Sequence, residues 1–356
     1  MIKINLTVLM LFWGAFLSAQ KSTVSGTLKD AASGEDLIAA TVIVKELKGI
    51  GAVANVYGFY SLSLQAGTYT LIYSSLGYTS IEKKVVLTES TQINIELAET
   101  ATSLNEFVVT SENENKNILK VEMGIEKISP KSIETIPVLL GEKDVIKTLT
   151  LTPGIKSAGE GSGGFSVRGG GVGQNLILLD ESVVYNASHL LGFFSVFNSD
   201  ALKDATLYKG GSPAEFGGRG SSVMNITMRD GNNKKFTASG GLGVIASRLT
   251  IEGPIVKNKS SFIISARRSY ADMFLKFSKK EELKSSRLYF YDLNLKANYQ
   301  INQKNRIYLS GYFGKDVLAI KKQFLFDWGN ITGTIRWNYL LNDKLFLKTS
   351  FIASKY

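Results

Sequence analysis

Cysteine is absent from this chain of 356 residues, histidine occurs once, at His189, and proline occurs only five times. The lack of cysteine excludes a disulfide framework, and a single histidine excludes a Cys/His zinc site. The apolar content of 44% is enough for buried cores but low for a helical membrane protein. Glycine is abundant, with 34 residues, and Tyr and Phe also total 34. Such a composition favours strands over helices.

Negative charge is scarce in the last hundred residues. Residues 257–356 contain 19 Lys and Arg but only 7 Asp and Glu, which accounts for the net charge of +10. No nucleic-acid recognition module accompanies this charge, so we do not predict nucleic-acid binding. A surface near anionic lipid headgroups or an anionic ligand is one explanation, and ordinary solvated loop charge is the other.

The first residues have the pattern of a secretory signal peptide. Lys3 precedes a mostly apolar run over residues 4–17, and small residues follow at Ser18 and Ala19. The run is too short for a membrane-spanning helix, which needs about 20 apolar residues. We therefore predict a signal peptide over residues 1–19 and a mature protein that works outside the cytoplasm.

Residues 20–97 alternate short apolar strands with glycine-containing turns, which predicts a small antiparallel β-sandwich. The predicted strands span residues 23–28, 40–46, 59–64, 69–74, 81–87 and 92–97. The stretches SGTLKDAASGEDLIAATVIVKE and NVYGFYSLSLQAGTYTLIYSSLGY resemble the carboxypeptidase-regulatory-like domain, which has a transthyretin-like or Ig-like fold. A zinc peptidase needs several His and Glu ligands, so we expect a periplasmic binding or spacer module with no enzymatic activity.

Residues 98–117 are predicted to be a linker that contains one short strand. A β-prone run in a soft linker is able to pair with the sheet edge of a partner protein. The sequence LNEFVVTS resembles the TonB box of outer-membrane receptors, to which the energy-coupling protein TonB binds. The residues of this TonB-box-like segment are Leu104, Asn105, Glu106, Phe107, Val108, Val109 and Thr110.

Residues 118–232 mix short helices and strands in a small α+β domain. We predict helices over 131–136 and 143–149, and strands over 165–168, 175–180, 204–209 and 222–228. Gly159, Gly161 and Gly164 match a GxGxxG pattern, but a strand follows them where a dinucleotide site needs a helix. We therefore expect no nucleotide and no other cofactor here.

The motifs FSVRGG, NLILLD and GGSPAEFGGRGSSVMNI resemble the plug domain of TonB-dependent receptors. The resemblance implies that Arg168, Asp180 and Arg219 lie where the plug meets the barrel wall. Residues 184–197 would form an apical loop. The aromatic side chains of this loop either face the ligand or belong to the plug core. The residues assigned to a ligand-facing loop are Tyr185, Asn186, His189, Phe193 and Phe194.

Residues 233–356 alternate apolar and polar residues over stretches of about ten, as lipid-facing barrel strands do. The clearest stretches are LNLKANYQ at 293–300 and ITGTIRWNY at 331–339. We predict about six antiparallel strands joined by short turns at 252–259, 301–305 and 342–344 and by long loops at 269–287 and 314–330. The resembled family has a barrel of about 22 strands, so we expect an N-terminal fragment that does not insert stably in a membrane by itself.

The resemblance as a whole is to a TonB-dependent outer-membrane receptor with an N-terminal carboxypeptidase-regulatory-like domain. It implies import of a ligand across the outer membrane, gated by the plug and driven by proton-motive force. The alternative is an outer-membrane receptor or scaffold that binds without transport. The implied partners are TonB, outer-membrane lipid and a small or oligomeric ligand, with an outer-membrane lipoprotein left open. The sequence does not distinguish an iron chelate, cobalamin, a glycan or a peptide as that ligand.

Overall fold

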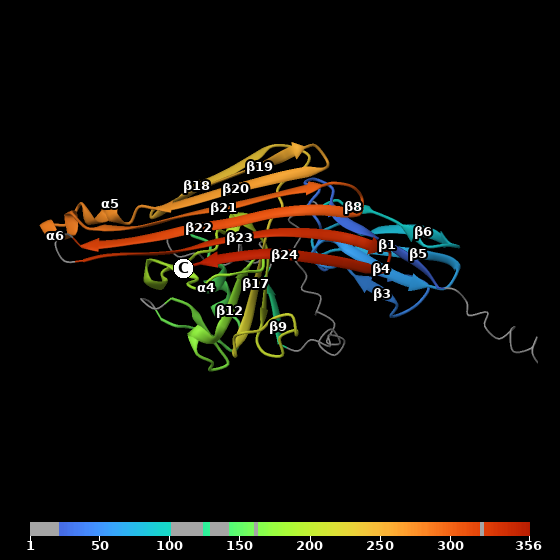
Figure 1. Cartoon of the computed structure of the whole chain (residues 1–356), viewed down its shortest axis with the longest axis horizontal. Helices are drawn as coiled ribbons and strands as arrows, with labels where there is room; N and C mark the ends of the chain where they lie inside the picture. Colours follow the sequence, from blue (N-terminus) through green and yellow to red (C-terminus); the bar gives the residue numbers. More distant parts are fainter. Residues whose placement is uncertain (1–20, 101–123, 129–141, 160–162, 321–323) are drawn as a thin grey trace, which may run out of the picture. The chain divides into compact units, whose positions relative to one another are not determined.

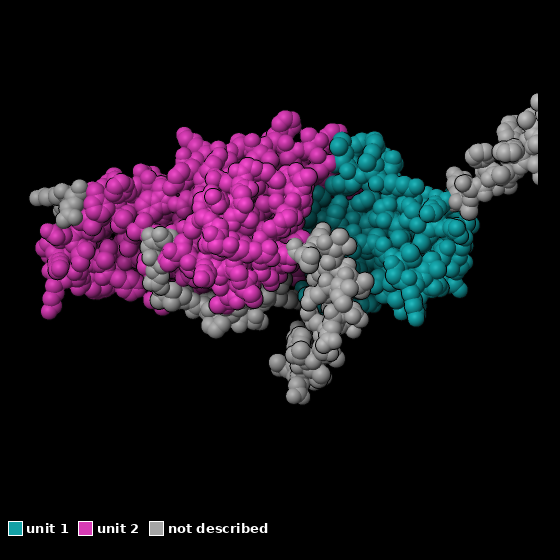
Figure 2. Space-filling model, turned by 90° about the horizontal axis from the view of Figure 1, so that it is seen from below, with its two compact units in different colours: residues 1–105, 339–347 teal, residues 106–338, 348–356 magenta. Residues whose placement is uncertain are grey.

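The computed structural model describes all of the chain except residues 1–20, 101–123, 129–141, 160–162 and 321–323. The chain divides into two compact units, residues 1–105 with 339–347 and residues 106–338 with 348–356 (Figure 2). The predicted signal peptide, the TonB-box-like segment and the predicted helix 131–136 lie outside the described residues. No described helix is long and apolar enough to cross a membrane.

The N-terminal domain is a β-sandwich, as predicted. One sheet has the order β4-β1-β7, with β8 also paired to β1, and the other has the order β3-β2-β5-β6. The strands are β1 (Ser22–Asp30), β2 (Thr41–Val44), β3 (Gly51–Val53), β4 (Phe59–Leu64), β5 (Gly67–Ser74), β6 (Ile81–Leu87), β7 (Thr91–Gln92) and β8 (Ile95–Leu97). Buried side chains of β1, β2, β4, β5, β6 and β8 fill the space between the sheets, and Leu28, Leu71 and Leu87 are completely buried there.

Two features of the sandwich differ from the prediction. Strand β1 pairs with β7 and β8 in parallel, although a wholly antiparallel domain was expected, because the chain returns from β6 in the other sheet and runs alongside β1. The strand β3 was missed because only three residues form it. Gly58 marks the turn before β4: its φ is +68°, and a Cβ there would lie 2.5 Å from the carbonyl oxygen of Leu28.

The middle domain, residues 124–232, is built on a five-stranded mixed sheet of order β13-β12-β17-β16-β9. Only β12 and β17 are parallel. The sheet strands are β9 (Ile125–Ile128), β12 (Asn175–Leu179), β13 (Ser182–Val183), β16 (Leu202–Tyr208) and β17 (Ser222–Met228). Two short hairpins accompany it, β10 (Ile155–Ser157) with β11 (Phe165–Val167) and β14 (Ser188–His189) with β15 (Phe194–Ser195).

Among the described residues of the middle domain, one short α-helix packs against the sheet. Helix α4 (Val145–Thr150) starts at Asp144, whose side chain accepts hydrogen bonds from the N–H groups of Ile146 and Lys147. Its buried residues join a core with Phe165, Leu207 and Met224. The described part of this domain also contains the 3₁₀ turns η1 (Val172–Gln174), η2 (Leu190–Gly192) and η3 (Ser199–Ala201). The predicted α+β character is therefore confirmed.

The C-terminal sheet has seven strands in chain order, one more than predicted (Figure 1). They are β18 (Thr237–Leu242), β19 (Ala246–Val256), β20 (Ser260–Ser269), β21 (Arg287–Gln300), β22 (Asn305–Ile320), β23 (Phe324–Asn342) and β24 (Leu345–Lys355). Helices α5 (Asp272–Leu275) and α6 (Glu281–Lys284) lie in the long loop after β20. Among the described residues β18 and β24 are the end strands, so the sheet is open and does not form a closed barrel.

The two faces of this sheet have opposite chemistry. On β21 the alternate residues Asp292, Asn294, Lys296 and Asn298 are buried, each no more than 3% exposed. The residues between them, Leu293, Leu295, Ala297 and Tyr299, are more exposed. Strand β23 repeats the pattern, with buried Asn330, Thr332, Thr334, Arg336 and Asn338 and exposed Ile331, Ile335 and Trp337. A sheet of a water-soluble protein has the reverse arrangement, so this pattern matches the predicted barrel strands.

Two predicted connections are wrong. The turn at 252–259 is shorter, because β19 continues to Val256 and keeps Pro254 within a strand. Strand β18 pairs with β19 only as far as Glu252, so Pro254 has a neighbouring strand on the β20 side alone, and proline is tolerated at such edge positions. The long loop at 314–330 is largely strand, since β22 reaches Ile320 and β23 begins at Phe324. Gly329 lies in a strand and not in a turn, and it permits the two strands to approach closely: a Cβ on Gly329 would lie 2.1 Å from the carbonyl oxygen of Gly314.

We predict that the sandwich core is sensitive to loss of a buried leucine. The Leu71→Ala substitution removes a completely buried side chain and should lower the free energy of unfolding by about 2–5 kcal/mol. The matched control Leu76→Ala changes a side chain that is 95% exposed and should shift it by less than about 0.5 kcal/mol. Urea unfolding with hydrogen exchange read over residues 21–99 makes the measurement. Equal effects of the two substitutions would contradict this assignment of the core.

Candidate functional site

The candidate site is the interface between the middle domain and the polar face of the C-terminal sheet. Hydrogen bonds and ion pairs cross this interface at several places, and most of the charged groups involved are buried. Buried charges are stable only when they are paired and their remaining hydrogen-bonding capacity is used. The interface therefore holds the two parts together through polar contacts that are specific in position.

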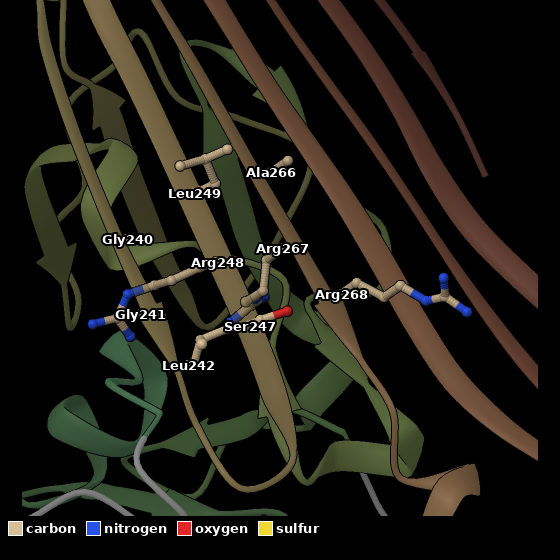
Figure 3. Close-up of a pocket in the computed structure, with 9 residues that line it drawn as sticks. All are labelled: Gly240, Gly241, Leu242, Ser247, Arg248, Leu249, Ala266, Arg267 and Arg268. Carbon is tan, nitrogen blue, oxygen red and sulfur yellow. The ribbon is translucent and has the colours of Figure 1, made fainter.

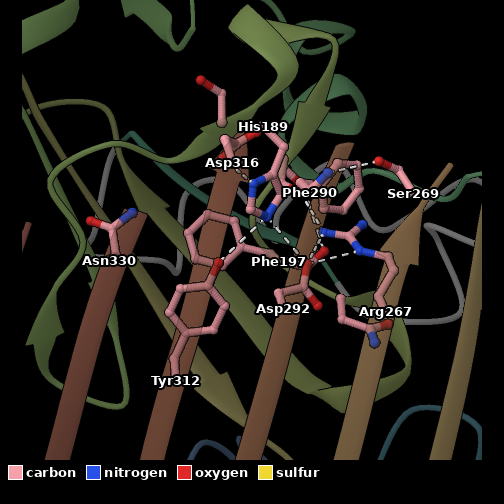
Figure 4. Close-up of polar contacts among 12 residues, drawn as sticks. His189, Phe197, Arg267, Ser269, Phe290, Asp292, Tyr312, Asp316 and Asn330 are labelled. Carbon is pink, nitrogen blue, oxygen red and sulfur yellow. Dashed lines mark hydrogen bonds and ion pairs between the residues drawn. The ribbon is translucent and has the colours of Figure 1, made fainter. Parts of the chain in front are cut away.

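The first group of contacts, here called the histidine cluster, consists of His189, Arg267, Asp292, Tyr312 and Asp316. His189 lies on β14 of the middle domain, and the other residues lie on β20, β21 and β22 of the sheet (Figure 4). The His189 Nδ1 atom lies 2.7 Å from a carboxylate oxygen of Asp316, and Nε2 lies 3.2 Å from Asp292. The imidazole ring also stacks on the ring of Phe290, with a centroid distance of 4.1 Å.

Arg267 lies next to Asp292 in this cluster and binds its carboxylate. Arg267 donates from Nε and Nη2 to Asp292, at 3.0 and 2.7 Å, and Nη2 also donates to the carbonyl oxygen of Ser195 in the middle domain. A carboxylate oxygen of Glu142 lies 3.7 Å from Nη1 of the same arginine. Burial raises the pKa of Glu142 above its ordinary value, although the neighbouring Arg267 opposes the rise.

The second group, here called the lysine cluster, consists of Lys296, Asp180, Asp230 and Lys203. The Lys296 ammonium lies 3.1 Å from Asp180 and 3.0 Å from Asp230, and it donates to the carbonyl oxygen of Met228. Lys203 lies 3.3 Å from the other oxygen of Asp230. Burial alone would raise the pKa of Asp230, but the positive charges of Lys203, Lys296 and Arg306 outweigh it and hold this pKa well below the ordinary value.

The turn between β12 and β13 presents Asp180 and Glu181 to the sheet. Both residues have positive φ, +46° and +76°, which non-glycine residues rarely adopt and which two-residue hairpins of type I′ require. The carbonyl oxygen of Asp180 accepts from Thr334, and Glu181 lies 2.8 Å from Lys348 and 3.4 Å from Arg336. Burial would raise the pKa of Glu181, but Arg336 and Lys348 lower it overall. The strained turn is thus held by contacts with the sheet.

The three residues predicted at the plug–barrel boundary lie in different surroundings. Asp180 contacts Lys296 on β21, as described above. Arg219 donates from Nη1 to the carbonyl oxygen of Gly173, which lies in the middle domain itself. The Arg168 guanidinium lies near Gly124 and Gly210, also within the middle domain. The role of the two arginines at a barrel wall stays a prediction.

The five residues of the predicted ligand-facing loop differ in their exposure and contacts. Tyr185 is 56% exposed and Phe193 is 39% exposed, so their side chains are accessible, and contact with a ligand stays a prediction for them. His189 and Phe194 are buried against Phe290 of the sheet, which counts against direct contact with a ligand. Asn186 is held through its backbone by the side chain of Asn330 on β23.

Sequence reasoning missed the sheet residues of both clusters. Arg267, Asp292, Lys296 and Asp316 lie 72 to 127 positions from these partners in the middle domain. The available signal was local: the period-2 pattern of 293–300 already placed Lys296 on the face opposite the leucines. No local pattern identified the partner.

A shallow groove of about 520 Å³ lies along β18, β19 and β20. Arg248, Arg267 and Arg268 line it and point in different directions from neighbouring strands (Figure 3). Each guanidinium already has a partner: Asp200 for Arg248, Asp292 for Arg267 and the ring of Tyr289 for Arg268. The groove therefore offers little uncommitted charge, and no cluster of metal-binding side chains exists in the described part of the chain.

We predict that Lys296 is required for a stable interface. The Lys296→Met substitution leaves the buried carboxylates of Asp180 and Asp230 without their shared cation and should lower the free energy of unfolding by about 3–5 kcal/mol. The control Lys315→Met removes an exposed ion pair with Asp327 on the same sheet and should have no measurable effect. Guanidinium unfolding in detergent micelles compares the two. Similar unfolding midpoints for both variants would show that the cluster contributes nothing to stability.

Comparison with known proteins identifies two domains. The model of the CarboxypepD_reg-like domain matches residues 24–109, and the model of the TonB-dependent receptor plug domain matches residues 125–223. No curated protein matches the chain.

Solved structures similar to the chain include the siderophore receptor PirA from Pseudomonas aeruginosa, with 15% identity and a TM-score of 0.48 over 65% of this chain and 40% of that one. PirA from Acinetobacter baumannii has 15% identity and a TM-score of 0.46, over 69% of this chain and 41% of that one. The outer membrane transporter YddB from Escherichia coli has 14% identity and a TM-score of 0.46, over 65% of this chain and 38% of that one. The chain thus spans about two fifths of the length of these neighbours. The two family models show that this chain carries a CarboxypepD_reg-like domain followed by the plug domain of a TonB-dependent receptor.

Proposed function

We propose that this chain is the N-terminal part of a TonB-dependent outer-membrane receptor that imports a ligand. The plug gates the pathway, and TonB pulls on the TonB-box-like segment, residues 104–110, to displace it. The observation that carries the proposal is the plug domain seated through buried polar contacts on a sheet whose other face is apolar. The N-terminal sandwich and the TonB-box-like segment would then lie in the periplasm.

A polar interface suits a plug that must move. Separating an apolar interface exposes apolar surface to water at about 25 cal/mol per Å². Charged groups such as Lys296 and Asp180, in contrast, regain hydration when they separate, which offsets part of the lost attraction. Contacts of this kind hold the plug in one position and still permit its release under a pulling force.

The apolar face of the sheet supports an outer-membrane location. Tyr289, Tyr291 and Phe313 form an aromatic group near one end of the strands, and Tyr299 and Trp337 lie on the same face toward the other end. Tyr289 and Tyr299 are about ten residues apart, which is about 33 Å along a strand and about 25 Å along the membrane normal at a tilt of about 40°. This spacing matches the apolar band of outer-membrane barrels, which is about 25 Å tall and bordered by aromatic residues.

The ligand would meet the exposed part of the plug. Tyr185 and Phe193 are the accessible residues of the predicted ligand-facing loop. Two of the similar solved structures are described as siderophore receptors, which makes a siderophore one ligand class to test among the iron chelate, cobalamin, glycan and peptide alternatives.

We predict that TonB binds residues 104–110. Purified TonB periplasmic domain should bind the chain, and deletion of these seven residues should abolish binding because strand pairing needs a continuous main chain. A variant with the same residues in scrambled order controls for linker length. In cells that carry the whole receptor, the deletion should stop uptake and leave surface binding of the ligand intact. Undiminished TonB binding by the deletion variant would favour the receptor or scaffold without transport.

We also predict that Leu295 faces lipid. This residue lies midway between Tyr291 and Tyr299 on the apolar face and is 42% exposed. Arginine at such a position costs about 2–4 kcal/mol at the bilayer centre. Leu295→Arg in the whole receptor should therefore reduce its recovery in the outer-membrane fraction. The control Val86→Arg, at an exposed position of the sandwich, should leave the recovery unchanged. Normal recovery of the Leu295→Arg protein would argue against a lipid-facing sheet.

A further inference from the structure

We propose that seating of the plug segment 188–197 on strands β20, β21 and β22 takes up one proton, which is held at His189. The inference concerns the same interface as the proposed import function but does not require that any ligand is transported. It rests on the geometry of the histidine cluster, in which both ring nitrogens of His189 face acidic side chains.

The two carboxylate contacts favour a second proton on the ring. An ionised carboxylate only accepts hydrogen bonds, and a neutral imidazole has a single N–H group. With Nδ1 at 2.7 Å from Asp316 and Nε2 at 3.2 Å from Asp292, a neutral ring would direct one lone pair at a carboxylate lone pair. A second proton on the ring removes this repulsion and converts both contacts into charge-assisted hydrogen bonds.

The charges around His189 support the same assignment. Arg267 neutralises Asp292, which leaves the negative charge of Asp316 to be balanced. Asp316 also accepts from the N–H of Leu190, so its charge is directed at the plug segment. An imidazolium at His189 makes this set neutral in a site where the ring is only 1% exposed. An unbalanced charge there would carry a large desolvation penalty.

The other surrounding groups do not supply this balance. Tyr312 Oη lies 3.5 Å from Nε2, farther than Asp292, and Glu142 lies beyond Arg267. Asp144 accepts from the N–H of Ser195 on the neighbouring strand β15. The parallel ring of Phe290, at an interplanar angle of 7°, presents its face to the imidazolium, which favours a cation.

The pKa of His189 in the seated plug determines how seating depends on pH. Burial lowers the pKa of His189, but the hydrogen bonds and charges of Asp292 and Asp316 outweigh it, so this pKa is raised above its ordinary value. In the displaced plug the imidazole regains an ordinary pKa near 6.5. The contribution of His189 to seating is therefore complete below about pH 6.5 and is lost as the pH rises through the raised pKa. Between pH 6.5 and the raised pKa, displacement of the segment therefore releases a proton.

The direct test observes the ring itself. His189 is the single histidine of the chain, so ¹⁵N labelling of histidine, with a purification tag that lacks histidine, gives one imidazole spectrum. In the folded chain both ring nitrogens should have N–H signals at pH 7.5, and the titration midpoint should lie above that of the same chain in urea. An unprotonated ring nitrogen at pH 7, or a midpoint at or below that of the unfolded chain, would overturn the proposal.

Hydrogen exchange over residues 188–197 measures the opening of this segment, which the proposal links to release of the His189 proton. After correction for intrinsic exchange, the opening equilibrium should rise about tenfold per pH unit between pH 6.5 and the midpoint of His189, because one proton is released. His189→Gln should abolish this dependence. Glu142→Gln is the matched control: it changes a carboxyl group at the same interface and should retain the dependence. Tyr312→Phe should also retain it, and its loss in that variant would instead assign the Nε2 contact to the tyrosine.

Residues 226–230 provide an internal reference in the same experiment. They are held by the lysine cluster, whose Asp230 stays ionised because its pKa is lowered. Their opening should therefore be independent of pH between 6.5 and 9. An equal rise in both segments would indicate general destabilisation at high pH and would refute a proton held at His189.

Discussion

The arrangement of the second compact unit, residues 106–338 with 348–356, depends on one constraint: the polar face of the C-terminal sheet must be matched by polar groups of the plug. Buried charges such as Lys296 and Asp292 are destabilising without partners, and water does not reach them once the plug is seated. The plug supplies Asp180, Asp230 and His189 at the required positions. Because each pair has a defined geometry, the contacts select one docking position, which an apolar interface of similar area would specify less sharply.

The same constraint explains the unusual backbone of the plug. Asp180 and Glu181 adopt positive φ although neither is glycine, and such conformations cost about 1–3 kcal/mol each. Ion pairs with Lys296, Arg336 and Lys348 hold the turn against this cost. Local strain and long-range electrostatics are thus coupled: displacement of the plug would break the ion pairs and at the same time permit the turn to relax.

The protonation of the two clusters depends differently on pH, although both are buried ion-pair networks. The lysine cluster joins groups whose ordinary pKa values lie far from neutrality, so its charges persist across the physiological range. The histidine cluster contains the one side chain whose ordinary pKa is close to neutrality. Seating of the plug therefore combines a pH-independent anchor with a contact that is proposed to exchange a proton, and displacement of the plug would work against both.

The sequence alone determined the domain order, the sandwich and most strands, because period-2 alternation and glycine turns are local signals. The strand over residues 222–228 was predicted with its observed bounds, and the alternation of apolar and polar residues over 293–300 in β21 was recognised. Local signals failed where a neighbouring strand decided the outcome. Pro254 lies in β19 at a position that β18 does not reach, and Gly329 lies in β23 where its backbone approaches that of Gly314 closely. The partners of His189 were beyond any local pattern. Asp292 and Asp316 are more than 100 residues away, and only the seating of the plug on the sheet brings their carboxylates to the two ring nitrogens.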